Sequence, residues 1–138
     1  MNNLTLIIPA KQESQSLPIV LQEIERLECK KIVILEETDL ETISAINNLD
    51  CKIIYQNNRG YGDALIEGIN SVQTEYLCIF NADGSFDPKY LSKKLELCKE
   101  QDYVFSSRYL KKGGSEDDTL ITRIGNFIFS LLGNILFS

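Results

Sequence analysis

The stretch LTLIIP at residues 4–9 is a continuous apolar run that contains β-branched residues and ends at a proline. Such a run is typical of a strand buried on both faces of a sheet. Three similar short runs follow at residues 32–35, 52–55 and 76–80, and segments with helical spacing of apolar residues separate them. Buried strands that alternate with amphipathic helices predict a mostly parallel α/β sheet in a three-layer α/β/α fold.

The helices between these strands are less sharply bounded than the strands. Apolar spacing predicts them around residues 17–27, 40–46, 65–72 and 88–98. Ser16 is the expected cap of the first helix, a capping box at 38–41 opens the second, and Asp87 caps the fourth. A fifth short strand is expected at residues 103–105.

The composition excludes several kinds of protein. The chain has 138 residues, of which 43% are hydrophobic and 25% charged, as in one globular domain. Its net charge is 14 − 20 = −6, which argues against nucleic acid as a partner. The absence of histidine excludes Ser-His-Asp triads and histidine zinc sites. The four cysteines form no CxxC pair and are expected mainly in the core of a cytoplasmic protein without a signal peptide.

Ligands of parallel sheets bind beyond the carboxyl ends of the strands. Asp83 lies in such a place, in the loop 81–88 after the fourth strand. A carboxylate there can hold a divalent cation whose other ligands are diphosphate oxygens. The alternative is a simple Asp-Gly turn, and for Asp87 helix capping is the favoured interpretation.

Two further loops open on the same edge. Residues 9–13 follow the first strand, and the acidic segment 36–39 follows the second. Their carboxylates could accept hydrogen bonds from a nucleobase or a ribose, although solvated charge and helix capping are the favoured interpretation for Glu37 and Asp39. The Gly60-x-Gly62 loop could approach a phosphate closely, but it lacks the dinucleotide fingerprint and the Walker lysine.

Together these segments resemble the family-2 glycosyltransferases with a GT-A nucleotide-sugar-binding domain. The most similar subgroup transfers sugar to a polyprenyl-phosphate lipid, as dolichyl-phosphate mannose synthases do. The matching elements, in chain order, are Ile7-Ile8-Pro9-Ala10-x-x-Glu13, Asn58-Arg59-Gly60-x-Gly62-x-Ala64-Leu65-x-x-Gly68, Asn81-Ala82-Asp83-Gly84-Ser85-x-Asp87-Pro88, Ser107-Arg108-Tyr109 and Gly125-Asn126. The resemblance covers nearly the whole chain.

The resemblance implies a nucleotide-sugar site with a divalent cation, Mg²⁺ or Mn²⁺, at Asp83. It implies that Arg108 binds the phosphate of the acceptor, the alternative being a surface salt bridge. The residues implied to bind the nucleotide sugar are Pro9, Ala10, Glu13, Glu36, Gly62, Asn81, Ala82 and Asp83.

The chain departs from the family pattern at three places. Asn81 replaces the first Asp of the family's Asp-x-Asp, Gln12 replaces an Asn, and residues 36–39 replace Asp-Asp-Gly-Ser. These changes leave the metal affinity and the nucleobase open. The catalytic base of the family lies beyond the matched segments, so no residue is assigned to that role.

The C-terminal part has a different character. We expect a nucleotide-sugar-binding domain at residues 1–118 and an apolar helix at 119–138. Residues 124–138 carry no charge, and these fifteen residues are short of the ~20 that span a bilayer. A core helix and a membrane-surface helix are the alternatives. Because the chain ends within this stretch, we expect it to be C-terminally truncated.

The function expected from the resemblance is transfer of a sugar from a nucleoside diphosphate donor to a polyprenyl-phosphate lipid or a cell-surface glycan precursor in polysaccharide biosynthesis. The expected location is the cytoplasm, at the inner face of the membrane, with a homodimer through the apolar helix. The alternative is a non-catalytic nucleotide-sugar-binding fragment. A nucleotidyltransferase is disfavoured because residues 9–16 contain neither glycine nor arginine, and a dehydrogenase because the glycine fingerprint is missing.

Overall fold

The computed structural model describes residues 1–107 and 119–137. The chain forms two compact units, residues 1–102 and residues 103–138. The first unit holds the sheet and all the helices that pack on it. Each unit is described separately below.

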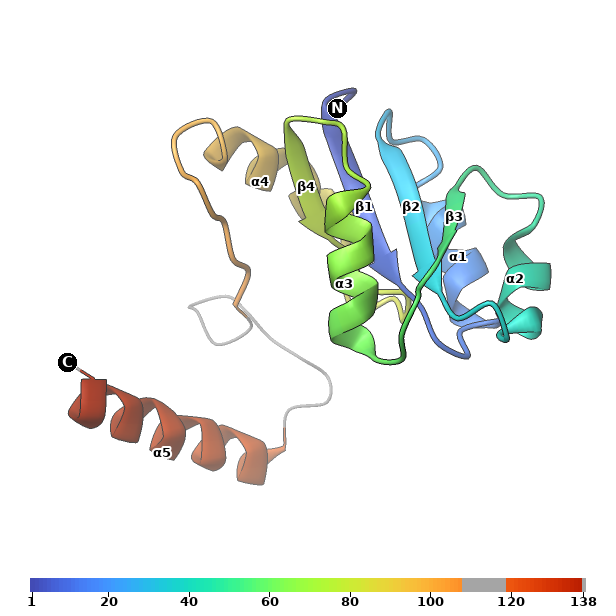
Figure 1. The fold of residues 1–138 in the computed structure, drawn as a ribbon. Helices are drawn as coiled ribbons and strands as arrows, with labels where there is room; N and C mark the ends of the chain where they lie inside the picture. The colour runs from blue at the N-terminus through green and yellow to red at the C-terminus, as the bar shows by residue number, and fades with distance from the viewer. Residues whose placement is uncertain (108–118, 138) are drawn as a thin grey trace. The chain divides into compact units, whose positions relative to one another are not determined.

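The first unit is built on a four-stranded sheet with the order β3-β2-β1-β4 (Figure 1). Its strands are β1 (Leu4–Pro9), β2 (Lys30–Leu35), β3 (Lys52–Tyr55) and β4 (Tyr76–Ile79). All three pairings are parallel, and Ile7 of the central β1 lies opposite both Ile32 and Ile79. This confirms the predicted parallel sheet and brings four carboxyl strand ends to one edge.

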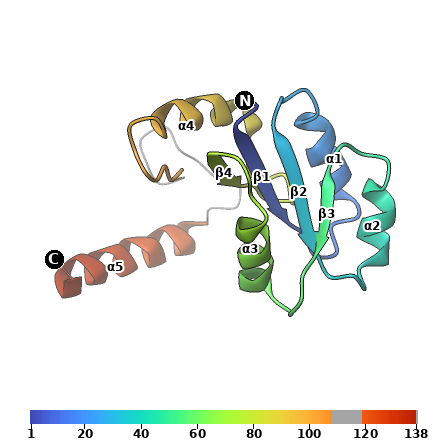
Figure 2. The ribbon, with the colours of Figure 1, turned by 45° about the horizontal axis from the view of Figure 1, so that its top comes forward.

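Helices cover both faces of the sheet, as Figures 1 and 2 show. One face carries α1 (Ser16–Glu23), α2 (Leu40–Ile46), the 3₁₀ turn η1 (Pro88–Tyr90) and α4 (Leu91–Leu97), and the other carries α3 (Tyr61–Asn70). On the first face Leu17, Ile46 and Leu91 join one buried cluster with sheet residues such as Leu6. On the second face Ala64 packs in a smaller cluster around Ile7 and Ile34. The predicted three-layer α/β/α arrangement is confirmed.

The cysteines pack as expected. Cys29, Cys51 and Cys78 lie half-buried against the larger cluster, and all four thiols are free. Burial raises the pKa of the Cys78 thiol, because desolvation disfavours the thiolate. Burial also raises the pKa of Cys29 and Cys51, so these three thiols are poor nucleophiles and act as small side chains that pack on the core.

Several helix ends and caps differ from the prediction; helix α3, for example, begins at Tyr61 rather than near residue 65. Helix α1 ends at Glu23 rather than near residue 27, because the following residues make tighter bonds, including one from the Leu27 N–H to the Ile24 carbonyl oxygen at 3.1 Å. Ser16 is not a cap, since its hydroxyl donates to the carboxylate of Glu13. The cap of α2 is Asp39, whose side chain accepts from the Thr42 N–H.

The predicted strand at residues 103–105 is wrong, because the structure has an irregular segment there. Tyr103 and Phe105 are 80% and 86% exposed, and their rings stack on each other with centroids 6.5 Å apart.

The second unit contains α5 (Leu120–Phe137), an 18-residue helix with a mean hydropathy of 1.5. It begins four residues before the apolar stretch recognised in the sequence, and by length and composition alone it could cross a membrane. Thr122, Asn126, Ser130 and Asn134 recur every four residues and so share one face of the helix. None of this 18-residue window is buried within the structure, and the choice between a core helix and a membrane-surface helix stays a prediction.

Candidate functional site

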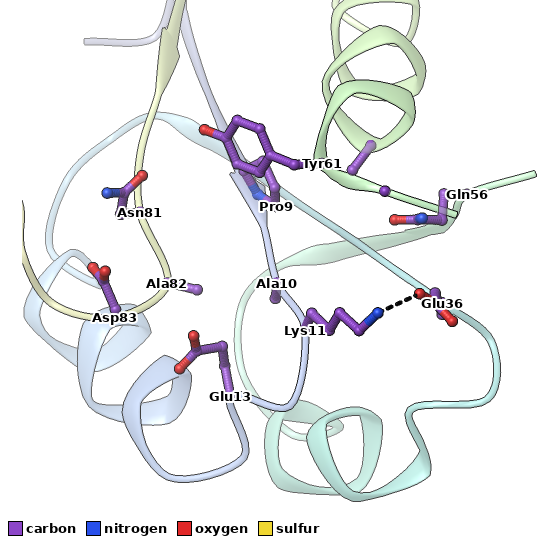
Figure 3. A pocket seen from close by; sticks show the side chains of 12 residues that line it. Pro9, Ala10, Lys11, Glu13, Glu36, Gln56, Tyr61, Asn81, Ala82 and Asp83 are labelled. Atoms are coloured by element: carbon purple, nitrogen blue, oxygen red, sulfur yellow. Dashed lines mark hydrogen bonds and ion pairs between the residues drawn. The ribbon is translucent and has the colours of Figure 1, made fainter. Parts of the chain in front are cut away.

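A cavity of about 340 Å³ lies at the carboxyl edge of the sheet (Figure 3). This volume is in the range of pockets that hold small ligands. The residues that line it are Pro9, Ala10, Lys11, Glu13, Glu36, Gln56, Gly60, Tyr61, Ala64, Asn81, Ala82 and Asp83. They come from the ends of all four strands and from the start of α3.

The cavity brings together almost all of the predicted nucleotide-sugar-binding residues. Pro9, Ala10 and Glu13 come from the end of β1 and its loop, and Glu36 follows β2. The group Asn81, Ala82 and Asp83 follows β4 and lines the opposite side.

Two predicted residues are not in this group. Gly62 lies in the first turn of α3, where Gly60 and Tyr61 line the cavity in its place. Arg108 lies outside the described residues. The roles of both residues stay predictions.

Sequence reasoning missed Lys11, Gln56 and Tyr61. Gln56 follows β3 directly, as Glu36 follows β2, so its place in the chain was a usable signal. Tyr61 follows Gly60, whose φ of 112° requires the conformational freedom of glycine and turns the chain into α3. Lys11 lies in the segment 9–13, where only Pro9, Ala10 and Glu13 were predicted to bind the ligand.

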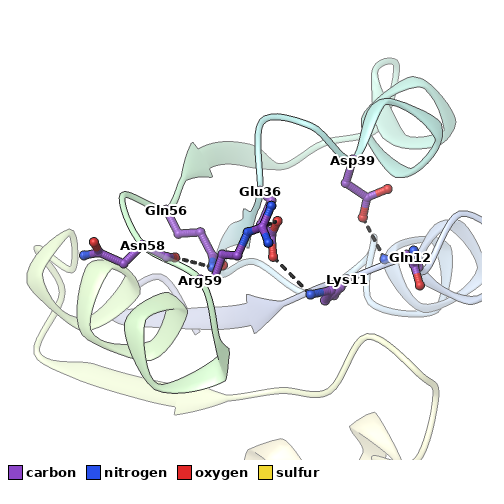
Figure 4. Close-up of polar contacts among 7 residues, drawn as sticks. All are labelled: Lys11, Gln12, Glu36, Asp39, Gln56, Asn58 and Arg59. Atoms are coloured by element: carbon purple, nitrogen blue, oxygen red, sulfur yellow. Dashed lines mark hydrogen bonds and ion pairs between the residues drawn. The ribbon is translucent and has the colours of Figure 1, made fainter.

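Charged groups surround Glu36 at one end of the cavity (Figure 4). The Nζ of Lys11 lies 3.1 Å from its Oε1, and the Nε of Arg59 lies 3.9 Å from its Oε2. The Glu36 side chain is 20% exposed, whereas Lys11 is 68% exposed. This end of the cavity therefore presents a largely buried carboxylate beside an exposed ammonium group.

The loop after β1 is fastened to the start of α2. Gln12 has a φ of 57°, a left-handed conformation that a residue with a long side chain rarely adopts. Its N–H donates to the Asp39 carboxylate at 2.7 Å, and the Glu13 N–H donates to the Thr42 hydroxyl at 3.0 Å. Asp39 therefore caps α2 and also holds the loop that carries Lys11 and Glu13.

We expect Asp39→Ala to lower the free energy of unfolding by about 1–2 kcal/mol, because it removes a helix cap and the acceptor of the Gln12 N–H. Thermal unfolding of this variant and of the unmodified chain measures the difference in stability. Glu37→Ala is the matched control, since Glu37 is exposed, and should change stability by less than about 0.5 kcal/mol. Equal stability of the two variants would show that Asp39 does not fasten the loop.

The other end of the cavity is a tight turn after β4. The Asn81 amide donates to the Ser85 hydroxyl at 2.9 Å, and the Ser85 N–H donates to Asp83 Oδ1 at 2.9 Å. Gly84 has a φ of 78°, as an Asp-Gly turn requires. Asp83 nevertheless stays exposed and lines the cavity, so the turn orients the carboxylate without closing it off.

The hydroxyl and then the N–H of Ser85 hold the pKa of Asp83 below its ordinary value, because both stabilise the carboxylate. The lowered pKa stabilises the folded chain at pH values above the ordinary aspartate pKa. This stabilisation is lost as the pH falls through the lowered pKa of the folded state. We expect Ser85→Ala to raise the pKa of Asp83, as measured by NMR titration of its carboxyl carbon. Ser92→Ala, on the exposed face of α4, should leave it unchanged.

The oxygen atoms near Asp83 provide only part of the ligand set that a hard cation needs. Within residues 1–107 and 119–137, no three acidic or thiol groups lie close enough together to hold a metal ion. Glu36 is paired with Lys11, and Glu13 accepts from Ser16. Asp83 alone therefore fits a Mg²⁺ or Mn²⁺ ion only if that ion takes most of its ligands from a bound diphosphate and water.

Comparison with known proteins gives one family. The model of the family described as Glycosyl transferase family 2 matches residues 5–137. A dolichyl-phosphate hexose transferase of Haloferax volcanii is 24% identical over 137 residues, which are 98% of this chain and 60% of that protein.

Two relatives of undefined activity also match. An uncharacterised protein of Methanocaldococcus jannaschii is 28% identical over 129 residues, 88% of this chain and 53% of its own length. An uncharacterised glycosyltransferase of Mycobacterium tuberculosis is 30% identical over 105 residues, 75% of this chain and 48% of its own. The chain thus spans about half the length of the curated relatives that it matches.

Proposed function

The chain belongs to glycosyl transferase family 2, and from this premise we propose that it binds a nucleoside diphosphate sugar in the cavity at the carboxyl edge of its sheet and transfers the sugar to an acceptor. Its parallel sheet with helices on both faces agrees with the GT-A fold of that family. The observation that carries the proposal is that three separate segments, residues 9–13, Glu36 and 81–83, line one cavity.

The two ends of the cavity suit the two ends of a nucleotide. Glu36 and Lys11 offer hydrogen-bonding groups to a nucleobase or ribose, and Asn81 and Asp83 lie where the diphosphate would bind. Gly60 exposes backbone beside the same cavity, without a side chain in the way. The donor would therefore lie across the strand ends from β2 to β4.

The negative charge of the cavity supports the proposal that a divalent cation binds together with the donor. Three carboxylates, from Glu13, Glu36 and Asp83, line it together with one lysine. A diphosphate would be repelled by this excess of negative charge. A divalent cation at Asp83 would neutralise the diphosphate and stabilise the charge that develops on it as the leaving group.

The acceptor that we propose is a lipid phosphate of the polyprenyl type or a glycan precursor. The relative from Haloferax volcanii is named a dolichyl-phosphate hexose transferase, which supports the lipid. The exposed apolar side chains of α5, such as Phe127 and Ile128, suit contact with a membrane surface on the cytoplasmic side. A homodimer through the same helix is the other role that this surface could serve.

We expect the chain to co-sediment with phosphatidylglycerol vesicles through α5. Ile128→Asp, on the apolar face, should abolish most of this binding, because a charge there cannot enter the acyl region without a large free-energy cost. Ser130→Asp, on the polar face, is the matched control and should retain it. Equal loss in both variants, or no sedimentation of the unmodified chain, would contradict a helix that lies in the membrane surface.

A thermal-shift panel tests donor binding. UDP-, GDP-, dTDP- and CDP-sugars are each added with and without Mn²⁺, and a bound ligand at 100 times its dissociation constant should stabilise the chain by roughly 2.7 kcal/mol. A Mn²⁺-dependent shift with one nucleotide supports the proposal, and flat traces across the panel contradict it.

A second candidate is a chain that binds the nucleotide sugar without transferring it. Asn81 in place of an Asp favours this alternative, because it brings no charge to a cation. Incubation with the donor and a polyprenyl phosphate separates the two functions, since only transfer releases the nucleoside diphosphate in proportion to glycosylated lipid.

A further inference from the structure

A second cavity, of about 410 Å³, lies where β1, β2 and β3 begin, at the edge of the sheet opposite the candidate site (top of Figure 1). This volume is in the range of pockets that hold small ligands. Among the described residues, three lysines, Lys30, Lys31 and Lys52, and one carboxylate, Asp50, line it. Their charges add to 3 − 1 = +2, in a chain whose net charge is −6.

The carboxylate of this cavity is paired with the buried lysine. Oδ2 of Asp50 lies 3.1 Å from Nζ of Lys31, whose side chain is only 3% exposed. The same ammonium group donates to the Leu27 carbonyl oxygen at 3.4 Å. A buried ammonium group needs such partners, because moving an unpaired charge out of water is costly. Asp50 therefore balances Lys31, and the positive charge that remains is that of Lys30 and Lys52.

Lys30 and Lys52 lie on the same face of the sheet. Lys52 pairs with Ile32 across β2 and β3, and alternate residues of a strand, such as Lys30 and Ile32, share a face. The strand spacings place the two lysine Cα atoms about 8 Å apart. Both side chains are exposed, and neither forms an ion pair within the part of the chain that the structure describes. Two unpaired ammonium groups so close together repel each other, and an anion between them removes this repulsion.

The uncharged groups of the cavity leave one further donor. The Ser71 hydroxyl donates to the Gly68 carbonyl oxygen at 2.7 Å, and the Thr5 hydroxyl is paired with that of Thr74 at 2.6 Å. Gln73 lies in the connection from α3 to β4 and is exposed, and its amide nitrogen can donate to a ligand. The donors that the cavity offers are therefore the two exposed lysines and Gln73.

We propose that the second cavity binds a small oxyanion of the phosphate class, held by Lys30, Lys52 and Gln73. A phosphate dianion matches the charge of two ammonium groups, and its several oxygen atoms accept from both lysines and from the amide at once. The volume also leaves room for the organic part of a phosphate monoester. The ligand is therefore either inorganic phosphate or a phosphate monoester such as a sugar phosphate.

The two cavities have opposite requirements for a cation. The candidate site has three carboxylates and one lysine, whereas the second cavity has three lysines and one carboxylate. A nucleoside diphosphate with bound Mg²⁺ does not suit the second cavity, because the lysines repel the cation and the cation occupies oxygen atoms that the lysines would bind. The oxyanion bound there is therefore free of metal.

The test is backbone NMR of the chain during titration with inorganic phosphate, at pH 8, at constant ionic strength and without divalent cations. The amide signals of Lys30, Lys52 and Gln73 should shift and saturate, while those of Glu36 and Asp83 stay in place. Glucose 6-phosphate is the second ligand, and glucose is the uncharged control, which should cause no shift. Tighter binding of glucose 6-phosphate identifies the ligand as a monoester, and equal or weaker binding identifies it as free phosphate.

Two lysine variants test the assignment of the residues. Lys52→Gln should weaken phosphate binding by about tenfold, because it removes a hydrogen bond from a charged donor. Lys93→Gln makes the same change of charge at an exposed position of α4 outside the cavity and should leave the affinity unchanged. Equal losses in the two variants would overturn the proposal. A titration of the unmodified chain in which these signals do not shift, or shift without saturation, would overturn it as well.

Discussion

Asp83→Ala should abolish the part of nucleotide binding that depends on Mn²⁺. Asp83 provides the carboxylate at the end of the cavity where the diphosphate is proposed to bind, since Glu36 is held by Lys11 and Glu13 by Ser16. Loss of a charged ligand should weaken binding by roughly 10- to 100-fold. In a titration with a nucleoside diphosphate, the affinities measured with and without Mn²⁺ should become equal.

Asp87→Ala is the control for this change. Asp87 has the same charge and lies four residues away, but it caps η1 through the Lys89 N–H and does not line the cavity. This variant should keep the Mn²⁺-dependent binding even if it is slightly less stable. A response to Mn²⁺ that survives in Asp83→Ala would place the cation elsewhere.

Gly68→Ala should lower the stability of the chain. A Cβ atom at Gly68 would lie 2.5 Å from Cγ2 of Ile7 and 2.9 Å from Cδ1 of Ile34, and both isoleucines are fully buried. Either α3 moves away from the sheet or the two side chains leave their rotamers, which typically costs about 1–3 kcal/mol. The gain in helix propensity, up to about 1 kcal/mol, offsets only part of a cost in the middle or upper part of this range.

Gly62→Ala in the same helix is the matched control for stability. No atom lies within 4 Å of a Cβ at Gly62, so the substitution should gain up to about 1 kcal/mol from helix propensity. The two variants should therefore shift the melting temperature in opposite directions, by several degrees each. A neutral or stabilising Gly68→Ala would mean that α3 does not pack on the sheet as described.

The centre of the sheet could be predicted from sequence because β1 and β2 are buried. The run at residues 4–9 is apolar at nearly every position, since β1 is central and contacts helices on both sides. The helix ends were harder to predict, because they depend on contacts with other parts of the fold, which the spacing of apolar residues does not show. The choice of Asp39 over Thr38 as the cap of α2 depends on the loop after β1, which binds the same carboxylate.

Much of the candidate site could be predicted for a similar reason. Strands that run in parallel end at one edge, so polar residues after β1, β2 and β4 had to lie near each other. Gln56 was missed because β3 is short and only partly buried, and its end was not treated as a site position. The role of Tyr61 depends on the turn at Gly60, whose geometry the sequence alone did not reveal.

Backbone NMR of the chain during titration with a nucleoside diphosphate and Mg²⁺ tests the central claim most directly, because the structure has a second cavity at the opposite edge of the sheet. That cavity, of about 410 Å³, is lined by residues that include Thr5, Lys31 and Cys51. We predict that the amide signals of Ala10, Glu36 and Asp83 shift and saturate together while those around the second cavity stay in place. Shifts confined to the second cavity, or no saturable shift at all, would contradict the account.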